Sequence, residues 1–305
     1  MSRLDNSDNP DLARLDKETE VEIIDAVRVP DSANPVMPVR LRQDDEFTFR
    51  CHQGVSCWND CCHGADITLT PNDILRLCAH LDIRPMEFLK TYTVPGMWDR
   101  ADLPVAKLKM SDADGKGACQ FLTEEGCSVY EHRPATCRYY PLGLASVKPK
   151  GADEKEDFFF LVREQHCCGH NEDKTQTVAA YRKEQGIEEY DDVNRGWMDI
   201  LMKMASWKNL GGPGGKDIAP QTKQMFFLVS TNVDGFRSFV FDTKFLETYE
   251  IDPEAVEILK TDDKVLLRLG FDWMKNVMFN EPTITLKEPI LHEAMAKARE
   301  NLGAM

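Results

Sequence analysis

The stretch CHQGVSCWNDCCHGAD, residues 51–66, places four cysteines within twelve positions, with two of them adjacent and a histidine directly after. Thiols that lie so close together in one loop are typical of either disulfides or a metal site. A chain of 305 residues, 42% of them hydrophobic, can bury a substantial core and does not need disulfides in order to fold. The stretch therefore provides the first candidate metal ligands, Cys51, Cys57, Cys61 and Cys62.

The expected location of the protein bears on the same choice. No apolar run approaches the roughly 18 to 20 residues of a membrane span, and the N-terminal sequence MSRLDNSDNPDLARLDKE lacks an apolar signal-peptide region. We therefore expect a soluble, cytoplasmic protein. In the reducing cytosol, clustered cysteines bind metal or carry out redox chemistry more often than they form structural disulfides.

The charge balance excludes some partners. The chain has 37 basic and 52 acidic residues, a formal net charge of -15. Such a chain repels nucleic acid and anionic membranes unless a basic patch overrides the overall field, and the sequence contains no such patch. We expect no nucleic-acid partner and no membrane partner, while a protein partner remains open.

A second cysteine group, CQFLTEEGCSVYEHRPATCRYYPLG, begins at Cys119. CQFL and CSVY predict two short strands joined by the turn TEEG, a hairpin that brings Cys119 and Cys127 close together. Pro134 is typical of the start of a helical turn, and Cys137 lies in that turn, where backbone N–H groups favour a thiolate.

Arg133 and Arg138 flank Cys137. We expect them to offset the negative charge of several thiolates around one metal, with ordinary surface ion pairs as the alternative.

A third group, HCCGH at residues 166–170, doubles the cysteine again at Cys167 and Cys168. His166 or His170 is a candidate for completing a mixed site, and a solvated or second-shell role is equally typical of such histidines. Adjacent residues of an extended chain point in opposite directions, so both members of a doubled cysteine can reach one ion only across a tight turn.

Cys78 differs from the other cysteines. TPNDILRLCAHL predicts a helix with Thr70 as N-cap and Pro71 in the first turn, and it places Cys78 on the apolar face. We expect a buried, inert thiol there.

Familiar catalytic signatures are missing. A radical-adenosylmethionine loop, C-x3-C-x2-C, would need a cysteine at residue 64, which is glycine. The bacterial ferredoxin run, the C-x2-C pairs of zinc ribbons and thioredoxins, HExxH, GxSxG and GxGxxG after a strand are also not found.

The expected fold class is α+β. RPMEFLKTYT predicts a second helix, DFFFLV at residues 157–162 predicts a buried strand, and apolar spacing after Thr175 predicts about five helices interrupted by a GGPGG loop at 211–215. The irregular, cysteine-rich module with short strands and helices is thus followed by a mainly helical region. We expect an extended N-terminal arm over 1–46, the cysteine module over 47–173 and the helical region over 174–305.

The cysteine stretch, the following ITLTPNDILRL and the second cysteine group together resemble the YkgJ-type cysteine-cluster proteins, also called the CxxCxxCC zinc- or iron-chelating domain family. That family places cysteines before a CC pair, then a helix, then the pattern C.fL...gCsiYe.RP..CR.yP. The resemblance covers residues from about 47 to 170, although the spacing here is C-x5-C-x3-CC rather than C-x2-C-x2-CC. It implies a metal-binding module and says nothing of the chain after Thr175.

Metal binding is the leading hypothesis. Four thiolates satisfy a 4Fe-4S cluster as well as a zinc or iron ion, and the doubled cysteines and nearby arginines favour the larger, more negative cluster. Nine candidate ligands exceed one tetrahedral site, so either two sites exist or some cysteines play supporting roles. The nine are Cys51, Cys57, Cys61, Cys62, Cys119, Cys127, Cys137, Cys167 and Cys168.

Two alternatives remain. The chain is distantly similar to flagellin lysine N-methylase, which uses S-adenosylmethionine with an iron-sulfur cluster, and this implies a cluster-dependent protein-modifying transferase. Trp197, Trp207 or Trp273 would then line a cofactor pocket, although their helical spacing is also typical of a plain core. A thiol-redox module without metal is the third hypothesis.

Overall fold

The computed structural model describes residues 36–112, 117–147, 156–209, 218–292 and 295–296. Short strands and helices alternate along the chain, which confirms the α+β class. The chain divides into two compact units, of which unit 1 comprises residues 1–62 and 137–187 and unit 2 comprises 63–136 and 188–305. No helix in the described ranges is long and apolar enough to span a membrane. Most of the predicted arm and the GGPGG loop lie outside the described residues.

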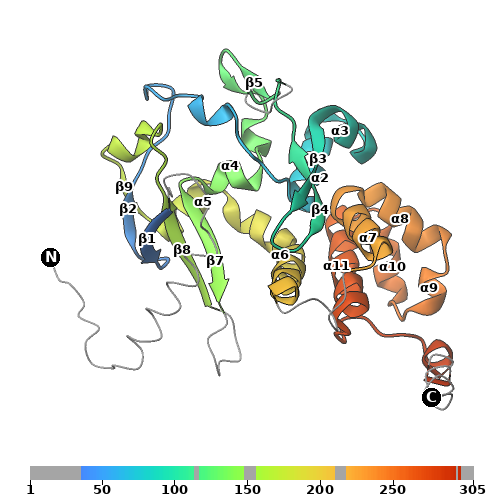
Figure 1. The fold of residues 1–305 in the computed structure, drawn as a ribbon. Helices are drawn as coiled ribbons and strands as arrows, with labels where there is room; N and C mark the ends of the chain where they lie inside the picture. The colour runs from blue at the N-terminus through green and yellow to red at the C-terminus, as the bar shows by residue number, and fades with distance from the viewer. Residues whose placement is uncertain (1–35, 113–116, 148–155, 210–217, 293–294, 297–305) are drawn as a thin grey trace, which may run out of the picture. The chain divides into compact units, whose positions relative to one another are not determined.

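A three-stranded antiparallel sheet of order β1-β8-β7 forms the framework of unit 1 (Figure 1). Its strands are β1 (Val36–Leu41), β7 (Leu142–Val147) and β8 (Glu156–Val162). The central strand contains DFFFLV, and Phe158 and Phe159 are buried, as the apolar run predicts.

A second, two-stranded ladder pairs β2 (Glu46–Thr48) with β9 (Thr175–Thr177). It leads into α5 (Val178–Glu184), whose N-cap Thr177 accepts a hydrogen bond from the Ala180 N–H. One cysteine loop follows β2 and another precedes β9, so this ladder brings the two loops to the same end of unit 1. The core beneath them consists of Leu41, Phe47, Phe49, Leu142, Phe159, Val178, Tyr181 and Ile187.

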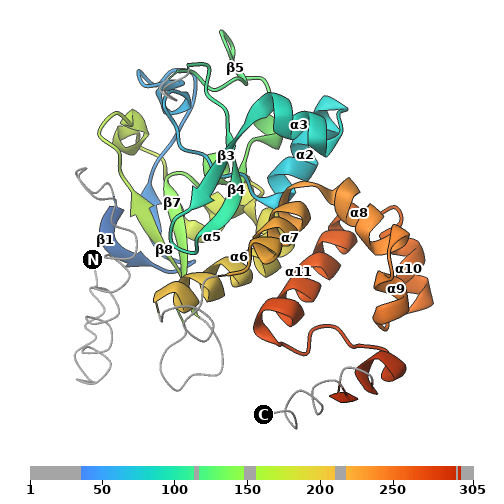
Figure 2. The same cartoon turned by 45° about the vertical axis from the view of Figure 1, so that its right-hand side comes forward.

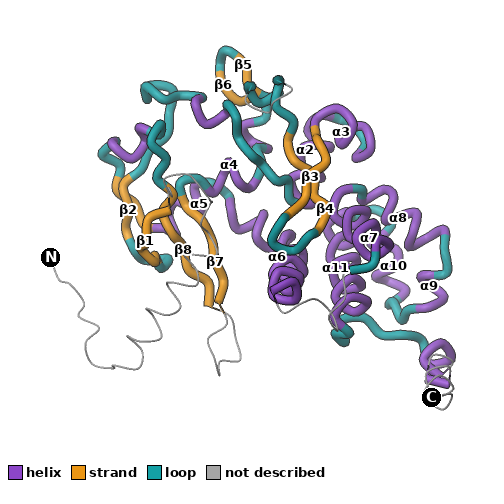
Figure 3. Tube along the Cα trace, in the orientation of Figure 1, coloured by secondary structure: helices purple, strands orange, loops and turns teal. Residues whose placement is uncertain are grey.

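Unit 2 begins with helices α2 (Pro71–Leu81) and α3 (Pro85–Tyr92). The predicted start of α2 is confirmed, because Thr70 Oγ1 accepts from the Asp73 N–H while the Asp73 carboxylate accepts from the Thr70 N–H. The chain continues through β3 (Thr93–Trp98) and β4 (Leu103–Leu108) to the predicted hairpin, β5 (Leu122–Thr123) with β6 (Gly126–Cys127), which Figure 3 shows as a short orange pair. The short helix α4 (Ala135–Tyr139) spans the division between the units and contains Cys137.

Helices dominate the rest of unit 2 (Figure 2). They are α6 (Ile187–Asn209), α7 (Pro220–Thr231), α8 (Val233–Asp242), α9 (Phe245–Thr248), α10 (Pro253–Leu259) and α11 (Asp263–Phe279). Buried side chains of α6, α7, α8 and α11 pack together with those of β4 in one core. The sequence prediction missed α8 and α9. The last predicted helix, EPILHEAMAKARENL at residues 288–302, is described only at residues 288–292 and 295–296.

Candidate metal centre

The first cysteine loop, residues 51–62, is a succession of tight turns. Backbone hydrogen bonds reverse the chain at Val55, Trp58, Asp60 and Cys62, each closing on the carbonyl three residues earlier. Asn59, inside the last of these turns, has a positive φ of 73°. These reversals keep the four cysteines of the loop within a short, tightly turned segment.

A histidine fixes the start of this loop. His52 Nδ1 accepts a hydrogen bond from the Gly54 N–H at 3.1 Å, which leaves Nε2 as the N–H that faces the Glu172 carboxylate at 3.0 Å. A side chain at Gly54 would approach the His52 ring to 2.9 Å, so the tight loop requires glycine.

Cys57 and Cys168 contact each other directly, although 111 positions separate them. The Cys168 N–H donates to Cys57 Sγ at 3.0 Å. The Ser56 hydroxyl in turn donates to Cys168 Sγ at 3.3 Å. Burial raises the pKa of the Cys57 thiol, and the nearby Cys167 and Cys168 add to this shift, while the backbone hydrogen bond opposes it.

Cys61 and Cys62 lie in a single 3-10 turn, Asp60–Cys62. This is the tight turn that a doubled cysteine needs if both thiols are to face the same way. A hydrogen bond with the Cys62 side chain lowers the pKa of Cys61 to about 7, although burial and the carboxylates of Glu164 and Asp60 act in the opposite direction.

Between them, Tyr140 and Glu164 interact electrostatically with cysteines of both loops. Burial raises the pKa of Tyr140, and the adjacent Cys167 thiol and the Glu164 carboxylate raise it further. Since Glu164 also acts on Cys61, the turn that contains Cys61 and Cys62 lies within electrostatic range of the loop that contains Cys167 and Cys168, all in unit 1. We call Cys57, Cys61, Cys62, Cys167 and Cys168 the thiol cluster.

Two more predicted ligands belong to unit 1, and both are exposed. Cys51 follows Arg50, whose backbone N–H bonds the Gly169 carbonyl at 3.0 Å, one residue from the thiol cluster. Cys137 lies in α4, and the guanidinium of the next residue, Arg138, is buried and donates to the Gln185 carbonyl at 2.7 Å. Arg138 is therefore a buried residue that binds a backbone carbonyl, and it differs in this from an arginine in a surface ion pair.

The remaining predicted ligands, Cys119 and Cys127, lie in unit 2. Both flank Leu122, whose N–H bonds the Cys119 carbonyl and which pairs with Cys127 across the hairpin. The predicted hairpin is confirmed, although Cys119 precedes β5 instead of lying in it, and Leu122 contacts both cysteines through its backbone. Arg133 is buried and donates to the Tyr130 carbonyl at 2.7 Å.

The two histidines of HCCGH differ in their surroundings. His166 Nε2 faces the Glu164 carboxylate at 3.6 Å, and both side chains are largely solvated. His170 is buried, its Nε2–H donates to the Val162 carbonyl at 3.1 Å, and its ring packs against Phe49. Burial lowers the pKa of His170, so this histidine is a neutral part of the wall beneath the loop.

Cys78 is the buried thiol that the sequence predicts. It is 6% exposed on α2 in unit 2, and burial raises its pKa to about 12. A thiol in that state neither binds metal nor reacts readily.

The thiol cluster has sulfur ligands that suit a metal ion, but its described side chains are not arranged in a coordination geometry. Among the described residues, no three Cys, His, Asp or Glu side chains are arranged to hold a metal ion. However, the structure places hydrogen-bond donors on Cys57 and Cys168, and such donors stabilise the thiolate form that soft metals bind.

Comparison with known families now decides the class. Residues 50–194 match the model of the CxxCxxCC family, described as a putative zinc- or iron-chelating domain. This part of the chain is a CxxCxxCC domain. The family predicted from the cysteine pattern is thereby confirmed, and the description of the family supports metal binding as the chemistry of the domain. No curated protein and no solved structure gave a significant match.

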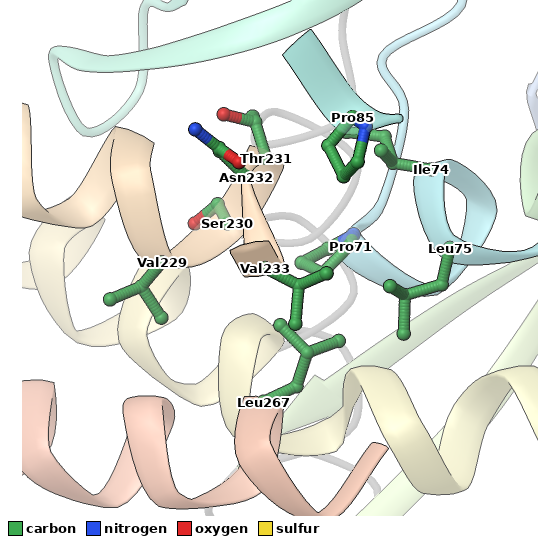
Figure 4. Close-up of a pocket in the computed structure, with 10 residues that line it drawn as sticks. All are labelled: Pro71, Ile74, Leu75, Pro85, Val229, Ser230, Thr231, Asn232, Val233 and Leu267. Carbon is green, nitrogen blue, oxygen red and sulfur yellow. The ribbon is translucent and has the colours of Figure 1, made fainter. Parts of the chain in front are cut away.

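The CxxCxxCC domain contains all nine predicted ligands, and its residues belong to both units. Outside it, Trp197 and Trp273 are buried in the helical core of unit 2 and Trp207 packs against that core. A small hollow in unit 2, with an empty volume of about 180 Å³, is lined by residues of α2, α3, α7, α8 and α11 and includes none of the three tryptophans (Figure 4). It is smaller than the roughly 300 Å³ of a typical small-molecule site.

Three polar residues beside the thiols were missed by the sequence analysis, namely Ser56, Tyr140 and Glu164. Ser56 directly precedes a predicted ligand, and Tyr140 is part of the CR.yP pattern, so both carried a weak signal. Glu164 carried none, because its relevance depends on how the loop after β8 folds back.

Proposed function

We propose that the thiol cluster of unit 1 is a thiolate metal centre. The observation that supports this most strongly is the Cys168 N–H aimed at Cys57 Sγ, together with the Ser56 hydroxyl aimed at Cys168 Sγ. A hydrogen bond from a neutral donor favours the ionised sulfur, and two such donors on thiols from opposite ends of the domain are typical of a metal-thiolate site.

Electrostatics support the same proposal. Burial raises the pKa of Cys57, and the neighbouring Cys167 and Cys168 thiols raise it further, because negative charge on either of them would repel a thiolate at Cys57. A bound cation reverses this effect, because it replaces the protons and neutralises the repulsion. The cluster is therefore arranged for several thiolates that carry a positive charge between them.

Both a four-thiolate zinc ion and a 4Fe-4S cluster suit these donors, with the five neighbouring thiols supplying one more than either requires. Zinc would fasten the two loops together, whereas an iron-sulfur cluster would add an electron-transfer group. Cys51 and Cys137 of unit 1 are the next candidate ligands, and Cys119 and Cys127 remain predicted ligands from the family pattern.

The test is metal content in protein purified without oxygen, measured by plasma mass spectrometry together with acid-labile sulfide and the visible spectrum. We expect bound iron with sulfide, or bound zinc without colour, in the wild-type chain. Cys57→Ser and Cys168→Ser should lose most of that metal, and Cys78→Ala, whose thiol is buried elsewhere, should retain it. Wild-type metal content in both cluster variants would contradict the proposal.

The same measurement on Cys119→Ser and Cys127→Ser decides whether the hairpin thiols contribute. Retention of metal in these two variants would confine the centre to unit 1, and its loss would extend the ligand set.

A further inference from the structure

Tyr140 presents a buried hydroxyl to the thiol cluster. Its oxygen is inaccessible to solvent and makes no hydrogen bond of normal distance and angle with any described residue. The polar groups that act on it are the Cys167 thiol and the Glu164 backbone N–H. A phenol O–H that is removed from water without a partner costs about 1 to 3 kcal/mol, so its persistence needs an explanation. Of these two groups only the thiol sulfur can accept the O–H, and Tyr140 and Cys167 pack against the same apolar core of unit 1.

Three contacts fix the rest of the half-buried Tyr140 residue. Its ring packs edge-on against Phe49 at 5.9 Å and against His170 at 6.3 Å. Its backbone carbonyl accepts a hydrogen bond from the Tyr181 hydroxyl. The hydroxyl is therefore held beside Cys167 by packing that does not depend on the thiol.

We infer that Tyr140 is a positioning residue of the metal centre, whose O–H donates a hydrogen bond to the metal-bound thiolate of Cys167. This inference rests on the proposed function, because it is the ionised, metal-bound sulfur that completes the hydrogen bond. It also assigns Cys167 as a ligand, which the doubled-cysteine pattern leaves open. Cys57, Cys167 and Cys168 then each receive one donor, from a backbone N–H, a tyrosine and a serine.

Cadmium is a suitable probe, since it binds thiolates whether the native metal is zinc or iron and its thiolate charge-transfer absorption reports the sulfurs directly. Metal-free, reduced full-length protein is titrated with Cd²⁺ in competition with a chelator. We expect Tyr140→Phe to bind Cd²⁺ about tenfold to a hundredfold more weakly than wild type and to shift the charge-transfer band, because outer-shell hydrogen bonds tune both affinity and sulfur electronics.

Tyr139→Phe is the matched control. It removes a hydroxyl from the neighbouring residue, which packs against the same apolar cluster, and that hydroxyl accepts a hydrogen bond from the Arg182 guanidinium. Tyr139→Phe should leave both Cd²⁺ affinity and the band unchanged, and thermal unfolding of both variants verifies that the fold is intact.

The possible results distinguish a failure of the proposed metal centre from a failure of the role assigned to Tyr140. Wild-type protein that binds no Cd²⁺ would overturn the proposed function. Wild-type binding with equal affinity and an equal band in Tyr140→Phe would overturn the role of Tyr140 and leave the metal centre standing. A weakened affinity with an unshifted band in both tyrosine variants would show a general packing defect and also overturn the assigned hydrogen bond.

Discussion

The pKa values of Cys61 and Cys78 are shifted in opposite directions. Cys61 has a pKa lowered to about 7 by its hydrogen bond with Cys62, whereas burial raises the pKa of Cys78 to about 12. With a pKa of about 7, Cys61 titrates between pH 6 and pH 8, and its thiolate fraction rises from about 10% to about 90% over this range. The thiolate fraction of Cys78 stays below about 0.1% over the same range. In metal-free, reduced protein we expect iodoacetamide to alkylate Cys61 about ninefold faster at pH 8 than at pH 6 and to leave Cys78 unmodified, as peptide mass spectrometry can show.

A pair of variants checks the cause of the Cys61 reactivity. Cys62→Ala removes the hydrogen-bond donor and should slow alkylation of Cys61 at pH 7, whereas Cys62→Ser retains a donor and should preserve it. Equal rates in the two variants would show that the turn itself, and not the neighbouring thiol, sets the reactivity.

At the scale of elements, the start of α2 depends on one buried carboxylate. Asp73 is fully buried, and it accepts hydrogen bonds at 2.8 Å from the N–H groups of Thr70 and Ala135. Since each buried N–H left without a partner costs about 1 to 3 kcal/mol, we expect Asp73→Ala, which leaves two, to reduce the free energy of unfolding by about 2 to 6 kcal/mol. Urea unfolding followed by tryptophan fluorescence measures this, because four of the five tryptophans, Trp98, Trp197, Trp207 and Trp273, lie in unit 2.

Glu87→Ala serves as the control for Asp73, since it removes an exposed carboxylate from the first turn of α3 and should change stability by less than about 0.5 kcal/mol. A similar small effect for Asp73→Ala would mean that other groups satisfy the two N–H donors.

The elements also show why sequence analysis succeeded where it did. Helix α2 was predictable because its signals, Thr70, Pro71 and Asp73, are consecutive in the chain and act locally. The hairpin was predictable for the same reason. The β1-β8 pairing and the contact of Cys57 with Cys168 depend on residues more than a hundred positions apart, and no local pattern encodes that distance.

On the scale of the whole molecule, the residues that match the family do not include all the segments that form the core of unit 2. The match stops at residue 194, but Phe226, Phe236 and Phe271 of the later helices are buried in that core together with Leu103 of β4. A chain ended after residue 194 should therefore lose the cooperative unfolding transition of unit 2, because β4 and α2 would expose apolar surface. A chain ended after residue 292 keeps these helices and should retain it.

Near-ultraviolet circular dichroism and urea unfolding of the two shortened chains test this expectation. The same transition midpoint in both would show that the helices after residue 194 contribute nothing to the stability of unit 2.

The interleaving of the two units also has a consequence for biosynthesis. Unit 1 is interrupted by residues 63–136, so Cys57 emerges from the ribosome 111 positions ahead of its partner Cys168. At translation rates of about 5 to 20 residues per second, the first loop waits roughly 5 to 20 seconds with its thiols unmatched. For the metal centre proposed above, metal loading of the thiol cluster would then be a late event in the life of the nascent chain, and oxidation of the thiols of residues 51–62 would compete with it.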